Sequence, residues 1–211
     1  GEVRARHRPL ALSDDPDART DPIERVDEPG VQVGRLVPRP LNLSLQRIGK
    51  NSQNLHAELM LRRLGLLDGS GSRADGLAVV GAQLEAAGVP RAAFDLHDGS
   101  GMSVYNRVSP RATTGVLRWT MGQSWGEAWR ATLPVGGRDG TLARRFVGTP
   151  LEGRIFAKTG SLNGVSALAG FLTAASGQTL IFAVYANDRP STAGSATEVM
   201  DRMLVALAAG N

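Results

Sequence analysis

Two apolar runs separated by a short turn constrain the fold of this chain more than any other feature. Residues 165–173 and 179–185 are rich in apolar and β-branched side chains, and the Ala-Ala-Ser-Gly-Gln segment between them is typical of a hairpin turn. Strands joined by so short a connection pair antiparallel. A third, shorter strand is predicted at residues 154–159, so we expect an antiparallel sheet in the C-terminal part of the chain.

Four helices are predicted before this sheet, each introduced by a serine that can cap its first turn. They begin at or just after Ser52, Ser72, Ser109 and Ser124, and the first two are expected to span residues 52–64 and 73–87. Leu55, Leu59 and Leu64 fall near one face of the first helix, with Ser52 as its N-cap. The fourth is expected to carry Trp125 and Trp129.

A closing helix is predicted over about residues 196–208, where Val199, Met203 and Leu207 recur at helical spacing. The predicted order is therefore helices, an antiparallel hairpin and a final helix. This order indicates an α+β fold, because a parallel sheet would need strands and helices in alternation.

The composition excludes several classes of site. The 211 residues contain no cysteine, which rules out disulfides and cysteine-ligated zinc, and the three histidines lack the spacing of metal ligands. The net charge of +4 comes from scattered arginines with few aromatics between them, which argues against nucleic-acid binding and fits a basic cleft for a carboxylate substrate. No apolar run reaches the roughly 18 residues of a membrane helix.

The beginning of the chain differs in composition from the rest. Residues 11–30 carry seven acidic side chains against two arginines, with prolines among them. Such a stretch is typical of a linker or of the edge of another domain. We therefore divide the chain into residues 1–35, a linker or the remnant of an inserted domain, and residues 36–211, one domain.

The Lys-Thr-Gly-Ser segment that begins at Lys158 is the first candidate for chemistry, because lysine occurs only twice in the chain. A lysine ammonium can hold a carboxylate or polarise a hydroxyl, and Thr159 adds a hydroxyl donor. Gly160 lets a ligand approach the backbone closely, so that the amide of Ser161 can face a developing oxyanion. The alternative is an exposed strand end that leads into a turn.

A second polar segment, Lys-Asn-Ser-Gln-Asn at residues 50–54, stands at the entrance of the first predicted helix. Ser52 and Asn54 are two residues apart and can face one cleft. There a hydroxyl can shuttle a proton and a carboxamide can hold a peptide group. The alternative is a capping serine followed by a polar first turn.

A third segment, residues 97–107, contains Asp-Gly-Ser-Gly, which is typical of a tight turn. The phosphate-loop pattern is not met, because no Gly-Lys-Ser or Gly-Lys-Thr follows. Taken alone, this segment indicates a structural loop.

Together the three segments resemble, in order and spacing, the C-terminal part of serine D-alanyl-D-alanine carboxypeptidases, the low-molecular-mass class C penicillin-binding proteins. That family has a Ser-x-x-Lys motif, then Ser-x-Asn, then Lys-Thr-Gly about a hundred residues later. Here Ser52-Gln53-Asn54 precedes the Lys-Thr-Gly of Lys158 by 106 residues. Residues 98–110 and 157–171 are also similar to the family, and the resemblance covers roughly residues 36–208.

The chain departs from the family pattern at the Ser-x-x-Lys motif. Arg47 stands three residues before Lys50, and Ile155 stands three residues before Lys158, so neither lysine follows a serine at the required spacing. We therefore expect this chain to be the C-terminal part of a longer polypeptide, with the acylated serine and its general-base lysine on a missing N-terminal segment. This chain alone is expected to be inactive.

The resemblance implies a penicillin-binding, β-lactamase-like domain, an antiparallel sheet with helices on both sides. It assigns Ser52, linked to Lys158, to a proton relay, and Asn54 to orientation of the substrate amide or of the missing lysine. Lys158 and Thr159 would bind the terminal carboxylate, and the Ser161 amide would form half of the oxyanion hole. No metal or organic cofactor is implied.

The implied partners are peptidoglycan stem peptides ending in D-Ala-D-Ala, β-lactam antibiotics and the missing N-terminal segment, in the periplasm or at the cell wall. Two alternatives stay open. A non-catalytic homologue that binds peptidoglycan or a partner protein would also lack Ser-x-x-Lys. A β-lactamase shares the order of motifs, although the loop at residues 98–103 and the long spacing argue against it.

Overall fold

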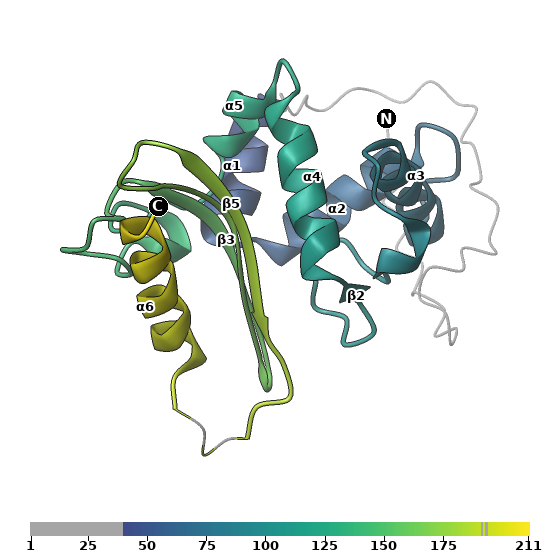
Figure 1. Cartoon of the computed structure of the whole chain (residues 1–211). Helices are drawn as coiled ribbons and strands as arrows, with labels where there is room; N and C mark the ends of the chain where they lie inside the picture. The colour runs from purple at the N-terminus through teal and green to yellow at the C-terminus, as the bar shows by residue number, and fades with distance from the viewer. Residues whose placement is uncertain (1–39, 191, 193) are drawn as a thin grey trace, which may run out of the picture. The chain divides into compact units, whose positions relative to one another are not determined.

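The computed structural model describes residues 40–190, 192 and 194–211. The predicted linker or domain remnant at residues 1–35 lies outside the described residues. The C-terminal half forms an antiparallel sheet of three strands in the order β3-β4-β5, namely β3 (Ile155–Leu162), β4 (Val165–Thr173) and β5 (Thr179–Ala186) (Figure 1). The predicted hairpin is confirmed.

The first strand is longer than predicted. β3 runs to Leu162, and its last residues pair with the start of β4, so that Ser161 faces Ser166 and Leu162 faces Val165. The connection is a two-residue turn in which Gly164 has a φ of 72°. Asn-Gly at this turn is a strong hairpin signal, so β3 and β4 form a second hairpin that the prediction ending at residue 159 missed.

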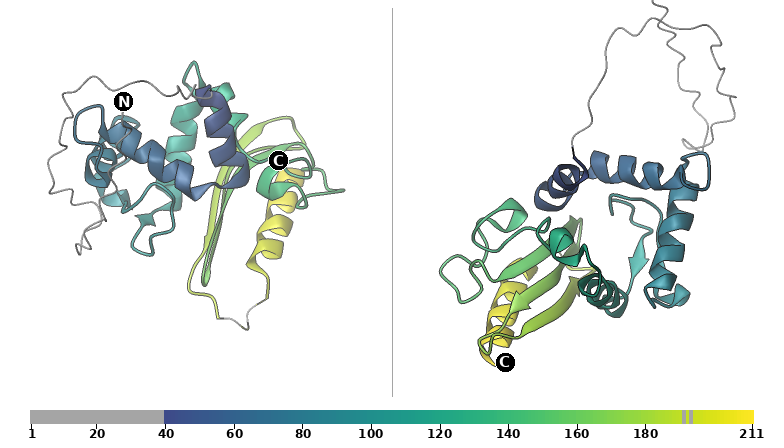
Figure 2. Two further views of the ribbon diagram at one scale, coloured as in Figure 1. Left: turned by 180° about the vertical axis from the view of Figure 1, so that it is seen from behind. Right: turned by 90° about the horizontal axis from the view of Figure 1, so that it is seen from above.

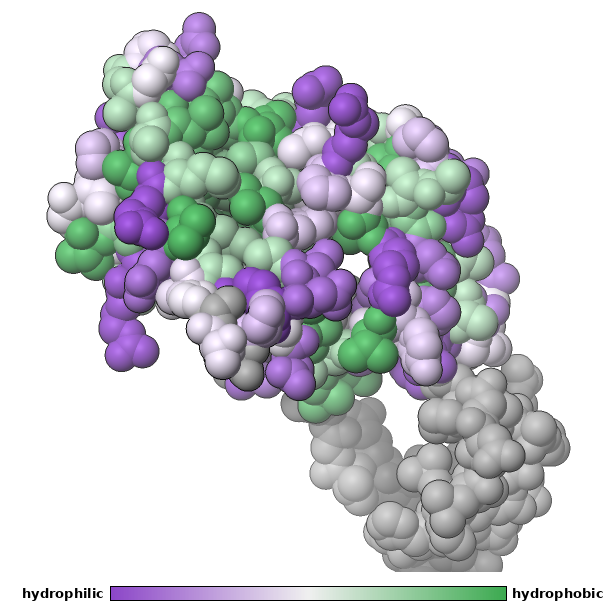
Figure 3. Space-filling model, turned by 60° about the horizontal axis from the view of Figure 1, so that its bottom comes forward, coloured by the Kyte–Doolittle hydropathy of each residue, from purple (hydrophilic) through white to green (hydrophobic). Residues whose placement is uncertain are grey.

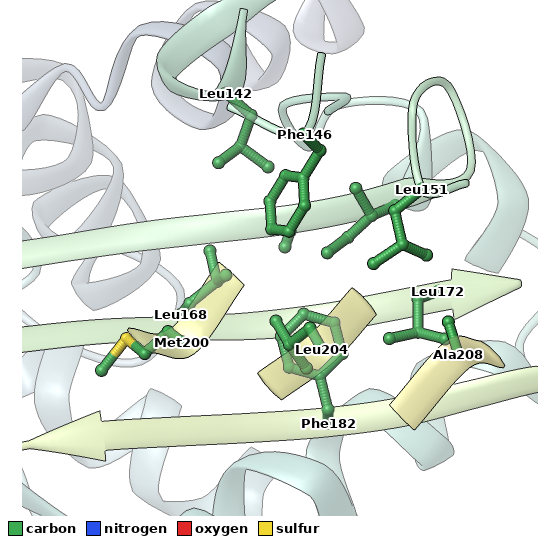
Figure 4. Packing of buried hydrophobic residues seen from close by; sticks show 11 residues of the cluster. Leu142, Phe146, Leu151, Leu168, Leu172, Phe182, Met200, Leu204 and Ala208 are labelled. Atoms are coloured by element: carbon green, nitrogen blue, oxygen red, sulfur yellow. The ribbon is translucent and has the colours of Figure 1, made fainter. Parts of the chain in front are cut away.

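One face of the sheet is covered by α6 (Ala196–Ala209) (Figure 1). Figure 4 shows Leu168, Leu172 and Phe182 of the sheet packed against Met200 and Leu204 of this helix. The cluster is completed by side chains from the chain before and within β3 and from the end of α6, namely Leu142, Phe146, Leu151, Ile155, Ala157 and Ala208. Burial of so many apolar side chains supplies the main stabilisation of this layer.

The closing helix was predicted correctly, but the face singled out by its spacing is not the buried one. Val199, Met203 and Leu207 are exposed, whereas the buried positions lie one residue further along at Met200 and Leu204. Both sets recur every four residues, so helical spacing alone did not decide which set meets the sheet. Figure 3 shows hydrophobic side chains at the surface on one side of the molecule, between hydrophilic ones.

The other face of the sheet packs against α4 (Pro110–Met121) and α5 (Gly126–Arg130). Leu117 and Leu133 contact Phe171 of β4, and the Trp129 ring lies edge-on to the Phe171 ring at 6.3 Å. Helices therefore cover both faces of an antiparallel sheet, which confirms the α+β class.

The start of α4 is as predicted, since the Ser109 hydroxyl accepts a hydrogen bond from the amide of Ala112. The helix α5 begins two residues later than expected, at Gly126. Trp125 precedes it as its N-cap instead of lying within it.

The remaining helices are α1 (Leu41–Asn51), α2 (Asn54–Gly65) and α3 (Arg73–Ala86), which lie on the α4 side of the sheet (Figure 2). Two short 3-10 helices, η1 (Arg91–Ala93) and η2 (Gly140–Leu142), and a two-stranded ribbon of β1 (Phe94–Asp95) and β2 (Arg107–Val108) complete the described elements. The bounds of α3 match the prediction to one residue, because Ser72 and Asp75 form a capping box.

The first predicted helix needs a correction. α2 begins at Asn54, and its N-cap is Gln53, whose side chain accepts a hydrogen bond from the amide of Leu55. Ser52 is instead the C-cap of α1, a helix that was not predicted. Leu55 and Leu59, placed on the apolar face by their spacing, are exposed in the structure.

Candidate active site

Ser52 lies at the joint between α1 and α2, where the chain changes direction. Its backbone is left-handed, with φ 53° and ψ 51°. For a residue other than glycine this conformation costs about 1–3 kcal/mol and persists only where the surroundings enforce it. The strained backbone indicates that the position of the Ser52 side chain is fixed by its neighbours.

Lys158 lies within β3 and reaches Ser52 across 106 residues of sequence. Its ammonium donates a hydrogen bond to Ser52 Oγ at 2.6 Å and another to the carbonyl oxygen of Thr159 at 2.8 Å. The structure thus brings together the serine and the lysine of two motifs that are distant in the chain.

The environment of Lys158 changes its acidity. Burial lowers the pKa of Lys158 below its usual value of 10.5, because a charged ammonium loses hydration in a partly apolar site. A lysine with a lowered pKa gives up a proton more readily than an exposed one. Hydrogen-bonded to a serine hydroxyl, it can pass a proton through that hydroxyl to a group in the cleft.

The other candidate residues on β3 follow Lys158 directly. The Thr159 hydroxyl donates to the Thr141 hydroxyl at 2.8 Å, and Gly160 and Ser161 are exposed. β3 is an edge strand of the sheet, so part of its backbone is not paired with a neighbouring strand. An extended peptide can therefore approach this edge beside the Lys158 ammonium.

Asn54 is less closely tied to the pair. It opens α2 and its side chain is exposed. Within the described part of the chain, no hydrogen bond joins its carboxamide to Ser52 or Lys158. The structure therefore places it two residues from Ser52 without showing a contact that would assign its role.

An apolar cavity of about 440 Å³ adjoins the site. It is lined by side chains of α1, α3, α4, the β1–β2 ribbon and the sheet, including Ile48, Leu84, Phe94 and Leu117. Lys158 is the one charged side chain among the described residues that line it. The ammonium therefore stands at the boundary between apolar space and the polar site.

The loop at residues 98–106 is a structural loop that docks on α2. The Asp98 carboxylate accepts hydrogen bonds from the amides of Gly101 and Ser103 and from the side chains of Ser100 and Asn106. Partial burial on its own raises the pKa of Asp98, but these hydrogen bonds outweigh it and hold the pKa below its usual value.

The docking itself comes from Glu58 of α2. Its carboxylate accepts hydrogen bonds from the amides of Gly99 and Ser100 at 3.0 and 2.9 Å. The Asp98 loop is thereby fixed to the helix that starts at Asn54.

Three residues close to the site have contacts that the sequence did not predict. Thr141 bonds Thr159, and an ion pair joins Lys50 to Asp139 at 2.7 Å. Thr141 lies in η2 and Asp139 directly precedes it, and neither belongs to a recognisable motif. Lys50 belongs to the second polar segment, in which the sequence indicated no role for it.

No cluster of three or more histidine, cysteine, aspartate or glutamate side chains suited to a metal ion occurs among the described residues. None of the helices in the described ranges is long and apolar enough to cross a membrane.

Comparison with known proteins decides the family. The model of the D-Ala-D-Ala carboxypeptidase 3 (S13) family matches residues 22–209. This chain belongs to that family. It is 38% identical over 165 residues to a D-alanyl-D-alanine carboxypeptidase of Actinomadura sp. (strain R39), a match that covers 75% of this chain and 30% of the relative. The suspected resemblance is thereby confirmed.

Relatives in other bacteria support the same family. Carboxypeptidase DacB of Mycolicibacterium smegmatis is 31% identical over 183 residues, which cover 83% of this chain and 40% of the relative. The crystal structure of penicillin binding protein 4 (dacB) from Haemophilus influenzae superimposes with a TM-score of 0.72 at 30% identity, covering 80% of this chain and 39% of that one. The chain thus spans less than half the length of these relatives.

A more distant likeness bears on the fold alone. A class A beta-lactamase from Bacteroides cellulosilyticus superimposes with a TM-score of 0.55 at 17% identity. Its match covers 78% of this chain and 62% of the enzyme. The family domain and the β-lactamases therefore share one architecture.

Proposed function

We propose that this chain supplies one side of the active site of a serine D-alanyl-D-alanine carboxypeptidase, with endopeptidase action on cross-linked stem peptides as the alternative preference. The observation that carries the proposal is the hydrogen bond between Lys158 and Ser52 in a chain of the S13 family. The Actinomadura and Mycolicibacterium relatives are both named carboxypeptidases, which supports the same reaction here.

The proposed reaction begins with a serine on a segment outside this chain. Its oxygen attacks the carbonyl carbon between the two D-alanines of a peptidoglycan stem peptide, and a lysine of the same segment takes its proton. The tetrahedral intermediate then collapses, and the carbon–nitrogen bond breaks. Ser52, recharged by Lys158, donates the proton that the leaving amine of D-alanine needs. Water finally hydrolyses the acyl-enzyme.

The residues of this chain would hold the substrate as well. Lys158 and Thr159 are proposed to bind the terminal carboxylate, by charge and by a hydroxyl hydrogen bond. Gly160 allows close approach, and the amide of Ser161 is proposed to stabilise the oxyanion. Asn54 is proposed to orient the substrate amide or the lysine of the other segment.

The apolar cavity supports a partner segment next to this site. A cavity of about 440 Å³ lined by apolar side chains from several elements can bury the apolar side chains of such a segment. We propose that the nucleophile-bearing segment fills this cavity, with its reactive serine near Lys158. The division of the chain into a linker at residues 1–35 and a catalytic-domain part at residues 36–211 belongs to the same proposal.

β-Lactams would act as inhibitors that acylate the same serine. The Haemophilus influenzae structure superimposes with a TM-score of 0.70 at 28% identity when complexed with a novel beta-lactam, which supports this proposal. Since peptidoglycan lies outside the cytoplasmic membrane, we propose an extracytoplasmic location, in the periplasm or at the cell wall.

Release of D-alanine by the complete polypeptide that contains this chain tests the function. We expect release from an acylated D-Ala-D-Ala peptide, and Ser52→Ala should slow it at least about tenfold because the proton relay is lost. Ser176→Ala, in the exposed turn between β4 and β5, is the matched control and should leave the rate unchanged.

Two other outcomes would replace the proposal. Faster turnover of a β-lactam than of the peptide would indicate a β-lactamase. Saturable binding of peptidoglycan without hydrolysis of either substrate would indicate a non-catalytic homologue.

A further inference from the structure

We propose that Lys50 and Asp139 form a clamp that positions Ser52 for the proton relay. Both are positioning residues, since they act on the reaction through Ser52 and through Thr141 without touching the substrate. The inference rests on the proposed function of the site and adds two residues to it.

The clamp is a two-pronged ion pair across 89 residues of sequence. The Lys50 ammonium donates to both oxygens of the Asp139 carboxylate, at 2.9 and 2.7 Å. One of these oxygens also accepts a hydrogen bond from the amide of Val135 at 2.9 Å. Asp139 is therefore fixed to its own loop and presents a rigid partner to the end of α1.

The backbones at the clamp are in close contact. Gly140 has a φ of 58°, and a Cβ there would lie 2.6 Å from the carbonyl oxygen of Lys50. A Cβ at Gly49 would overlap the carbonyl oxygen of Thr132. The last turn of α1 is thus wedged between two loops, and only glycine at these two positions allows the approach.

The clamp lies close in sequence to Ser52 on one side of the site and to Thr141 on the other. Lys50 comes two residues before Ser52, and Asp139 comes two residues before Thr141. Three contacts therefore close a ring, and they join Lys50 to Asp139, Thr141 to Thr159, and Lys158 to Ser52. Opening the ring at the ion pair removes the side-chain restraint on Ser52 on the side that Lys158 does not hold.

Such a restraint is needed because of the strained backbone of Ser52. A left-handed serine tends to relax to a right-handed conformation when its neighbours allow it. Relaxation would carry its hydroxyl away from the Lys158 ammonium. A pair that is 20% exposed at Lys50 and 46% exposed at Asp139 contributes little to global stability, so its main effect is on position.

A double-mutant cycle in the complete polypeptide tests the clamp. We expect Lys50→Met to lower kcat about tenfold with KM nearly unchanged. In a Ser52→Ala background the same substitution should lower kcat less than about twofold, because the effects of coupled residues are not additive. Lys50→Arg should restore most of the rate, since a guanidinium also pairs with a carboxylate through two hydrogen bonds.

The matched control is the ion pair between Arg145 and Asp201, which are 18% and 22% exposed and join the chain before β3 to α6. Arg145→Met should leave the coupling between Lys50 and Ser52 unchanged. An equal loss from Lys50→Met in both backgrounds, or an equal effect of Arg145→Met on kcat, would overturn the inference.

A second measurement is independent of activity. The chain has only two lysines, so ¹⁵N-lysine spectra of the 211-residue chain give two ammonium signals, and Lys50→Met assigns the one from Lys158. Asp139→Asn should speed the hydrogen exchange of the Lys158 ammonium several-fold, whereas Asp201→Asn should not. Unchanged exchange in Asp139→Asn would overturn the clamp, while an inactive complete polypeptide would overturn only the proposed function.

Discussion

Replacement of Lys158 by methionine should have opposite effects on activity and on stability. Methionine keeps most of the side-chain volume and removes the charge. The variant loses the hydrogen bond from the ammonium to Ser52 Oγ, which is 2.6 Å long. Proton transfer by a positioned side chain contributes about a hundredfold to ten-thousandfold to a rate, and the ammonium supplies the proton of the relay. We expect Lys158→Met to slow acylation of the complete polypeptide by at least about tenfold.

Lys158→Met should not lower the stability of the folded chain, although it lowers the acylation rate. Burial lowers the pKa of Lys158, so the folded state disfavours the charged form relative to the unfolded state. This penalty is fully present below the lowered pKa and disappears as pH rises through it to the ordinary value of 10.5. At neutral pH the methionine variant should unfold at the same or a higher temperature. The unfolding temperature of the wild type should rise relative to that of the variant as pH approaches 10.5.

Two assays check these expectations. Labelling of the complete polypeptide by a fluorescent penicillin measures acylation. Thermal unfolding of the 211-residue chain between neutral pH and pH 10.5 measures the destabilisation caused by the buried ammonium. Arg154→Met, at the exposed residue just before β3, is the control for loss of a cation and should change neither result. Unchanged labelling in Lys158→Met would remove this lysine from the mechanism. A melting temperature lowered equally at every pH would refute the burial argument.

Two further predictions concern the frame around the site. Asp98→Asn should destabilise the chain at neutral pH. The lowered pKa of Asp98 means that its carboxylate stabilises the folded state above pH 3.8 and loses this effect as pH falls through the folded pKa. Chemical unfolding at several pH values should show that the difference in unfolding free energy between the wild type and the variant shrinks in acid. Leu204→Ala should lower the free energy of unfolding by about 2–5 kcal/mol, since this side chain is fully buried between α6 and the sheet. Val199→Ala, on the exposed face of the same helix, should lower it by less than about 1 kcal/mol. Equal losses of the two variants in urea unfolding would contradict the observed burial.

Local signals in the sequence determine much of this fold. The caps at Ser72 and Ser109 and the hairpin turn after β4 are short-range features, and the structure reproduces them. The start of α1 has no such signal, because Pro40 offers no side chain to cap it. The buried face of α6 was ambiguous because two sets of residues share the same spacing, and only the packing of Leu204 on the sheet resolves it.

The site depends on contacts that local patterns do not encode. Ser52 and Lys158 could be paired only through the resemblance to a family, since nothing in composition or periodicity links residues 106 apart. Ser52 was expected at the start of a helix, and the structure places it at the end of another, in a left-handed conformation that propensity disfavours. No sequence pattern links Lys50 to Asp139, and only the folded chain shows that they meet.

Intact-mass spectrometry with benzylpenicillin tests the central claim most directly, namely that this chain holds the proton relay and another segment holds the nucleophile. The 211-residue chain should form no covalent adduct, because neither lysine has a serine three residues before it and Ser52 is committed to the relay. The complete polypeptide should gain one adduct, on a serine outside these residues. A stoichiometric adduct on any serine of this chain, or none on the complete polypeptide, would contradict the account.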